Sequence, residues 1–287
     1  MEERGGIFLK LKKILFFLIS YIYIFISVNL VLAHEIVHLD RAKIRLSILP
    51  GEKKTGQITI TNPSNQTKEI RVYLEDWYYL SPFDGSKEFK PAGTLPNSCS
   101  VWISFSPSEF EILPFGRQIL NYIVSVPEDI EGGYYSVLFF EELLGKPEVE
   151  EGISVGVAVR IGALFYIEPE GKVLRKTKLE NVSIDREGSS LEIKADLINT
   201  GNADITAKGN FHIIDRKGMV YARGKFNDVY TFPKDKAKIS SKSTAKLKEG
   251  IYNLIITLQF EERGTEVLEA EINVDSKGKI TKILTMP

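Results

Sequence analysis

Cysteine and histidine are scarce in this sequence of 287 residues, which contains one cysteine, Cys99, and three histidines, His34, His38 and His212. A single cysteine excludes an intramolecular disulfide, so the fold has to be stabilised by its packed cores. No neighbouring His or cation stands ready to lower the pKa of Cys99, and we interpret it as incidental rather than as a nucleophile. The histidines lack Cys or carboxylate partners at metal-ligand spacing, which predicts no metal site.

An excess of either charge is also missing, since 37 Lys and Arg residues stand against 38 Asp and Glu residues. Proteins that bind nucleic acid carry a basic face or stripe, and none is visible here. The most basic stretch, 234–248, is interrupted by Asp235 and by Ser and Thr residues. We interpret it as a solvated loop and strand edge, and predict no nucleic-acid partner.

Catalytic motifs are absent from the sequence. No Ser lies in a Gly-x-Ser-x-Gly turn, and no Gly-rich phosphate loop follows an apolar strand. Asp and Glu residues are scattered over the chain, although carboxylates from distant strands can converge, as they do in glycosidases. The sequence therefore predicts a non-enzymatic protein without a cofactor, with a carbohydrate-acting enzyme as the weakest alternative.

A basic and then strongly apolar N-terminus is present. Arg4, Lys10, Lys12 and Lys13 precede an apolar run over 14–32, which ends in Val31-Leu32-Ala33. This order is typical of a secretory signal cleaved after Ala33. The run of about twenty residues is also long enough for an uncleaved membrane anchor. Under both interpretations 1–33 is a signal peptide or anchor, and the rest is exported to the periplasm, the cell surface or the medium.

Apolar residues alternate with polar ones from Lys43 onward. Examples are Ile58 and Ile60, then Ile70, Val72 and Leu74, then Val101, Ile103 and Phe105. Such alternation predicts antiparallel strands with one buried face. Gly, Pro and Asn clusters separate the runs, and no stretch after Ala33 predicts a helix longer than two turns. We expect an all-β fold.

Two features occur twice in the same order. Asn62 ends a strand in the first half and Asn199 ends one in the second, and Gly133-Tyr134-Tyr135 is echoed by Gly250-Ile251-Tyr252. In Ig-type domains such a tyrosine pins a corner through its hydroxyl. The pattern restarts near Glu168. We therefore predict two immunoglobulin-like β-sandwiches, 34–168 and 169–287, connected by a short joint.

Short motifs follow one another along the first predicted sandwich, at 39–41, 49–51, 58–62, 70–77, 105–114 with Gln118, 126–127, 135–138 and 164–166. In these motifs and their order, this sandwich resembles the N-terminal domain of periplasmic pilus chaperones of the chaperone–usher type. The second sandwich resembles the family only in being Ig-like.

The resemblance implies a mechanism in which an edge strand is added to a partner polypeptide. Alternating apolar residues that could form this strand follow a charged stretch, 141–151, which we expect to be a mobile loop. They are Ile153, Val155, Val157, Val159 and Ile161. The alternative is that these residues form the last strand of the domain and pack on its own core.

The family also uses a basic pair that holds a partner's terminal carboxylate. The corresponding positions here are Leu46 and Ala163, and neither is basic. Lys43, Arg45 and Arg160 lie nearby in sequence and are the possible replacements.

Together these observations predict an exported, non-enzymatic, chaperone-like protein of the pilus-assembly class. Its partner would be an exported subunit or a surface polypeptide, and it would touch a membrane only through 1–33 if that segment is retained. The alternative is a structural or adhesion module at the cell surface, possibly anchored in the membrane.

Overall fold

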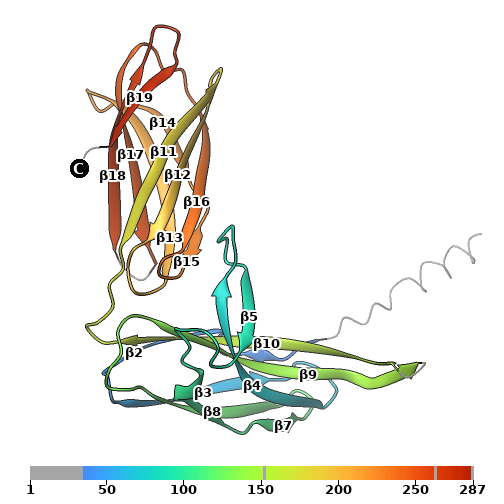
Figure 1. The fold of residues 1–287 in the computed structure, drawn as a ribbon. Helices are drawn as coiled ribbons and strands as arrows, with labels where there is room; N and C mark the ends of the chain where they lie inside the picture. Colours follow the sequence, from blue (N-terminus) through green and yellow to red (C-terminus); the bar gives the residue numbers. More distant parts are fainter. Residues whose placement is uncertain (1–34, 151–152, 262–263, 286–287) are drawn as a thin grey trace, which may run out of the picture. The chain divides into compact units, whose positions relative to one another are not determined.

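A computed structural model describes residues 35–150, 153–261 and 264–285 (Figure 1). These residues form strands, turns and a single 3₁₀ turn, η1 (Ser100–Trp102), so the predicted all-β fold is confirmed. Within this part of the chain no helix is long and apolar enough to cross a membrane. The predicted signal or anchor, 1–33, lies outside the described residues. Contacts group Val37–Pro287 into one compact unit, separate from 1–36.

The first sandwich packs two sheets around one core. One sheet has the strand order β1-β3-β8-β6, and the other has the order β2-β10-β9-β4-β5, with β7 also paired to β4. The strands are β1 (His38–Leu39), β2 (Lys43–Ile48), β3 (Lys53–Thr61), β4 (Lys68–Tyr79), β5 (Lys87–Pro91), β6 (Ile103–Ser106), β7 (Glu109–Ile112), β8 (Arg117–Ser125), β9 (Tyr134–Glu150) and β10 (Ile153–Pro169).

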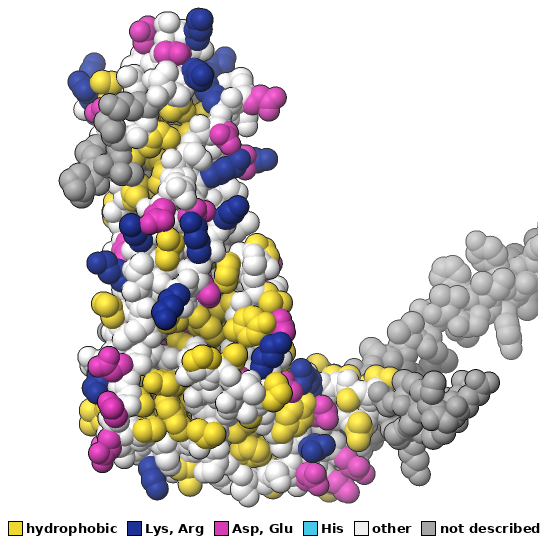
Figure 2. All heavy atoms as spheres, viewed as in Figure 1, with side chains coloured by type: hydrophobic (Ala, Val, Ile, Leu, Met, Phe, Trp, Pro, Cys, Tyr) yellow, Lys and Arg dark blue, Asp and Glu magenta, His cyan; other side chains and the backbone are white. Residues whose placement is uncertain are grey.

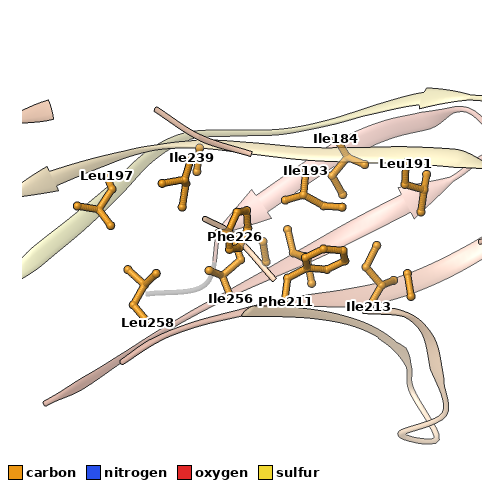
Figure 3. Close-up of a cluster of buried hydrophobic side chains, with 14 of the residues drawn as sticks. Ile184, Leu191, Ile193, Leu197, Phe211, Ile213, Phe226, Ile239, Ile256 and Leu258 are labelled. Atoms are coloured by element: carbon orange, nitrogen blue, oxygen red, sulfur yellow. The ribbon is translucent and has the colours of Figure 1, made fainter. Parts of the chain in front are cut away.

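The second sandwich consists of sheets with the orders β11-β12-β16 and β14-β13-β17-β18-β19, and β15 also pairs with β13. Its core is lined by Phe211, Ile193 and Ile256, among others (Figure 3). The strands are β11 (Thr177–Glu187), β12 (Ser190–Asn199), β13 (Ile205–Asp215), β14 (Val220–Lys225), β15 (Val229–Thr231), β16 (Lys236–Thr244), β17 (Gly250–Phe260), β18 (Thr265–Val274) and β19 (Ile280–Thr285).

Alternation predicts most strands but fails at Val101. This residue lies in η1, where it is 81% exposed, and the strand begins only at Ile103. The N–H of Ser100 donates to the hydroxyl oxygen of Ser98, and the N–H of Trp102 donates to the carbonyl of Cys99. These local bonds close a turn at the start of the apolar run, because Ser side chains compete with strand pairing for backbone groups.

The expected loop is wrong for 141–150, which form the end of β9, whereas Glu151 lies outside the described residues. β9 continues to Glu150 and pairs with β10 in antiparallel register, so that Glu150 lies opposite Ile153. The pairing of β9 with β4 ends at Glu142. Beyond that point β9 and β10 continue as a two-stranded ribbon (Figure 1). Backbone pairing with β10 therefore orders a charged segment that has no core to bury.

An aromatic cluster and an ion cluster connect the two sandwiches. Trp77, Tyr79 and Tyr135 from the first sandwich surround Phe232, which stacks on Tyr135 at 4.1 Å between ring centroids. In the ion cluster, the two guanidinium nitrogens Nη1 and Nη2 of Arg45 donate to the two carboxylate oxygens of Asp204 at 2.9 and 2.7 Å. Asp204 is buried, and the charged partners that complete this ion cluster are Glu168 and Arg175.

The predicted echo corresponds to matching geometry at the two asparagines. Both side chains are buried, and each accepts a hydrogen bond from the N–H two residues later, at Ser64 and at Gly201. Each Nδ2 donates to the carbonyl four residues later and to a carbonyl of a second segment. One side chain therefore holds a turn and ties it to a neighbouring strand in each sandwich.

The two echoed tyrosines differ. The hydroxyl of Tyr252 donates to the carbonyl of Lys248 at 3.1 Å, which is the corner contact expected of an Ig-type domain. The hydroxyl of Tyr135 instead accepts the N–H of Asp204, at 2.6 Å, from the second sandwich. Gly133 makes this approach possible, because a Cβ there would lie 2.0 Å from the Tyr135 hydroxyl oxygen.

Candidate partner-binding edge

Strand β10 changes neighbours along its length. On one side it pairs with β9 from Ile153 to Ile167. On the other side it pairs with β2, in parallel, only from Leu164 to Pro169. Among the described residues no strand pairs with 153–163 on that second side. We call this segment the open edge.

The direction of the backbone groups on the open edge follows from one hydrogen bond. The N–H of Leu164 donates to the carbonyl of Ala42 at 2.9 Å, so Leu164 faces β2. Backbone direction alternates with a period of two along a strand. The N–H and C=O groups of Ala158, Arg160 and Gly162 therefore face the open side, whereas those of Val157 and Val159 face β9.

The apolar side chains of the open edge lie on the core-facing side of the sheet. The Cα partners of Val157, Val159 and Ile161 are Leu144, Glu142 and Phe140, and cross-strand partners share a face. Ile161 packs against the core, Val159 is half-buried and Val157 is 58% exposed. Ile153 and Val155 belong to the same strand, beyond a register shift between Val155 and Val157.

The two interpretations of 153–161 thus apply to different parts of one strand. From Ile161 to Ile167 the apolar side chains serve the domain's own core. From Val159 toward Val157 exposure rises, and solvent takes the place of neighbouring side chains. An exposed apolar strand edge is a feature that proteins normally suppress with charge, proline or a covering segment.

A buried ion pair that the sequence did not reveal lies beside this edge. Nζ of Lys68 contacts the two oxygens of Glu142 at 2.8 and 2.9 Å, and both residues are buried. Glu142 is the Cα partner of Val159. Breaking a buried pair is far more costly than breaking an exposed one, so it fixes β9 in position against β4. A lysine at the start of an alternating strand gives no sequence signal of burial.

Two of the three predicted basic anchors are engaged within the chain. Arg45 belongs to the ion cluster of the joint. Arg160 donates to Glu75 at 2.8 Å and lies over the ring of Phe139, at 4.0 Å from its centroid. Of the two family positions, Leu46 packs against the core and Ala163 is buried within it.

Lys43, the third predicted anchor, lies at the start of β2, where the pairing of β10 with β2 begins and the open edge ends. It is the Cα partner of Leu164, and its Nζ is 5.0 Å from the centroid of Tyr166. Its one ion pair, with Glu261 at 3.2 Å, is exposed. Lys87, which the sequence did not single out, is close by. Burial, and secondly the charge of Lys43, lower the pKa of Lys87.

The remaining candidates for chemistry lie apart from this edge. Cys99 is fully buried, and burial raises the pKa of its thiol to about 12. His38 lies in β1, His212 is half-buried in β13, and His34 falls outside the described residues. Within the described chain no three His, Cys, Asp or Glu side chains are grouped as a metal site would require.

Carboxylates do gather in one hollow, of about 550 Å³, where β4, β7 and β9 meet. Glu69 and Glu111 are cross-strand partners there, and Glu141 accepts a hydrogen bond from the hydroxyl of Tyr73 at 2.6 Å. The enzyme alternative would have to act in this hollow.

No family model and no curated protein matches the chain. Solved structures that resemble it are chaperones of pili or fimbriae, the class that the sequence resembles. The YadV chaperone is 10% identical, with a TM-score of 0.42 over 82% of this chain and 98% of that one. CfaA, a class 5 fimbriae chaperone, is 11% identical, with a TM-score of 0.45 over the same shares. The CsuC–CsuE chaperone–subunit complex of Acinetobacter baumannii is 12% identical, with a TM-score of 0.42 over 82% of this chain and 98% of that one. Because identities and TM-scores are this low, the functional argument rests on the geometry of the chain itself.

Proposed function

We propose that this chain is an exported, non-enzymatic, chaperone-like protein that binds a partner polypeptide by adding the partner's strand to the open edge of β10. The observation that carries the proposal is the unpaired side of 153–163. Strand addition supplies main-chain hydrogen bonds for affinity and alternate side chains for specificity. The backbone groups of Ala158, Arg160 and Gly162 would make the bonds, and Val157, Val159 and Ile161 would supply the side-chain contacts.

Ile153 and Val155 extend the proposed contact along the ribbon. The ribbon extends beyond Glu142, where the pairing of β9 with β4 ends, so β4 would not obstruct a strand that binds to this part of β10. The N-terminal segment supports the setting: export by 1–33 would bring the edge to exported partners in the periplasm or at the cell surface.

Lys43, with Lys87 beside it, is the place where we propose that a partner's carboxylate is held. A strand added along 153–163 would end where β2 begins, at Lys43. Burial and the charge of Lys43 lower the pKa of Lys87, and a bound anion would offset the repulsion between the two lysines. Arg45 and Arg160, which keep their own carboxylate partners, would position the edge.

A pair of proline variants tests strand addition. Ala158→Pro removes an N–H from the open side, whereas Val159→Pro removes one that faces β9. Proline is tolerated where the lost N–H faces solvent. We expect Ala158→Pro to fold normally and to capture no partner from an extract of exported proteins of the cells that make this chain. Val159→Pro should lower the midpoint of urea unfolding.

A second pair tests the side chains. Val157→Asp should abolish capture, while Ile123→Asp should leave it unchanged, since Ile123 is 41% exposed but is paired on both sides, with Thr55 and with Ser104. Amide exchange should slow at 158, 160 and 162 in the captured complex. Capture that survives both Val157→Asp and Ala158→Pro, with folding intact, would contradict the proposal and favour a structural or adhesion module.

A further inference from the structure

The end of the second sandwich away from the joint carries four turns. Strands β11, β13, β16 and β18 all run from the joint toward this end, as their pairing registers require. The turns that follow them cover 188–189, 216–219, 245–249 and 275–279. We call this surface the distal end. It is independent of the open edge, which belongs to the first sandwich.

Two of these turns are built alike, and in each an aspartate carboxylate accepts backbone N–H groups of its own turn. In Asp215-Arg216-Lys217-Gly218-Met219, one carboxylate oxygen of Asp215 accepts the N–H groups of Lys217 and Met219 at 2.8 and 2.9 Å. In Asp275-Ser276-Lys277-Gly278-Lys279 the same bonds reach Lys277 and Lys279 at 2.9 and 2.7 Å. Both glycines have a positive φ, of 82° and 76°. The aspartates thus face backbone donors, and the basic side chains remain outside.

The third turn adds two more cations. Leu247 is 3% exposed and packs into the core, so its neighbours Lys246 and Lys248 point outward and are exposed. Arg186 connects two of the basic turns to its own turn, since its guanidinium donates to the carbonyls of Leu247 and Gly278 as well as to that of Gly188.

The distal end is therefore strongly basic. Figure 2 shows Lys and Arg side chains, together with Asp and Glu side chains, over the surface of the second sandwich. At the distal end Glu187 and Glu249 are exposed acids, and exposed cations outnumber them. None of these cations has an ion pair among the described residues. They are Arg216, Lys217, Lys246, Lys248, Lys277 and Lys279.

An apolar tip accompanies the charges. Met219 is 63% exposed, Val220 51% and Tyr221 37%, directly after Lys217. The adjacent hollow, of about 400 Å³, is lined by residues of both signs, including Asp215 and Glu249. It does not select a single anionic ligand. A flat array of anions can instead meet all three basic turns at once while an apolar tip enters between them.

We propose that the distal end docks on the anionic headgroups of a phospholipid bilayer, with Met219 inserted at the interface. This membrane contact differs from the one that the sequence predicted, which was limited to 1–33. Basic residues near an anionic bilayer are attracted to it, and the attraction falls with salt. The consequence is that the second sandwich would face the lipid, independently of any partner bound to the first.

The test is sedimentation of the full chain with phosphatidylcholine vesicles, with or without phosphatidylglycerol. Lys217→Glu combined with Lys277→Glu should weaken binding to the anionic vesicles more than about 25-fold, because removing two cations costs about fivefold each and the two new carboxylates are repelled. Lys53→Glu combined with Arg117→Glu is the matched control, because both residues are exposed on the first sandwich and the change in net charge is the same. The segment 1–33 is common to all variants and cancels in the comparison.

The remaining outcomes are decisive too. Met219→Ser should weaken binding to anionic vesicles without changing its salt dependence, and circular dichroism checks folding in each case. Lys217→Gln with Lys277→Gln removes the two charges without reversing them and should give a smaller loss of vesicle binding. This variant replaces the Glu variant if the reversed charges unfold the turns. Equal loss in the control variant would overturn the proposal. So would binding of polyglutamate by the unaltered chain with no preference for anionic vesicles, which would indicate an acidic protein partner.

Discussion

Tyr135 and Tyr252 occupy equivalent places in the two sandwiches, two residues after a glycine at the start of β9 and of β17, yet their hydroxyls bond in different directions. Tyr252 bonds within its own domain, at Lys248. Tyr135 bonds across the joint, at Asp204. The echoed asparagines, Asn62 and Asn199, keep the same role in both halves. An echoed motif can therefore retain one contact and redirect another.

The redirected contact matters because Asp204 is the centre of the joint. Its carboxylate meets Arg45 and Arg175, and its N–H meets Tyr135. The open edge and the ion cluster belong to the same strand, since Glu168 near the end of β10 completes the cluster. The first sandwich thus uses one strand both for its exposed surface and for its attachment to the second sandwich.

The largest expected effect is that of Asp204→Ala. Removing the buried carboxylate of Asp204 leaves two guanidinium groups, those of Arg45 and Arg175, to share Glu168, at a cost of about 3–5 kcal/mol. We expect the urea transition to lose this free energy and to separate into two steps, as the sandwiches uncouple. Glu261→Ala is the control, because the exposed pair with Lys43 contributes less than about 1 kcal/mol. A loss of equal size in both variants would show that the joint does not depend on Asp204.

Asn62→Ala and Asn199→Ala should each cost about 2–3 kcal/mol, since each leaves buried backbone groups without partners. If the echo reflects equal roles, the two losses agree within about 1 kcal/mol. The measurement is the midpoint of urea unfolding at constant slope. A large loss at one site only would show that the shared geometry does not carry equal energy.

Tyr135→Phe and Tyr252→Phe should differ. The first leaves the N–H of Asp204 buried and unpaired, at about 2 kcal/mol, whereas the second frees a partly exposed carbonyl at about 1 kcal/mol. We also expect Tyr135→Phe alone to increase amide exchange at the joint, around 202–204. Equal exchange there in both variants would contradict a role for Tyr135 between the sandwiches.

The smallest effect at neutral pH concerns Cys99, a thiol in the core of the first sandwich only. Its folded pKa, about 12, lies above the ordinary value of 9.0. The unfolded chain therefore loses the proton first, and its contribution to stability is full below pH 9 and falls above it, by about 1.4 kcal/mol per pH unit. Cys99→Ala should flatten the loss of stability between pH 9 and pH 11 by that slope. An unchanged pH profile would argue against a buried thiol.

Alternation along the sequence predicted the strands that have one wet and one buried face, such as β8, where Leu120, Tyr122 and Val124 point inward. It failed for 141–150, because a ribbon without a core under it shows no such alternation, and Glu141, Glu142 and Pro147 there indicate a loop. Strand pairing depends on two segments at once, so the sequence of one segment does not predict it.

The open edge was expected only as one of two alternatives. The residues of 153–161 alternate equally well for a core strand and for an exposed edge, and only the point where pairing with β2 begins, at Leu164, distinguishes them. The partners of Arg45 and Lys68 are also long-range, 159 and 74 residues away. No local signal predicts them. The turns at Asp215 and Asp275 have similar sequences, but the sequence does not show that both lie at the distal end of the second sandwich.

The unpaired side of β10 also has a consequence for the amount of protein that a cell can hold. Every copy without a partner exposes the same backbone groups, and two such copies can pair with each other as readily as with a foreign strand. If strand addition is the function, copies in excess of the partner would pair with each other. The number of copies able to bind the partner would then depend on the ratio of the two polypeptides. Production of the two polypeptides would then have to be matched.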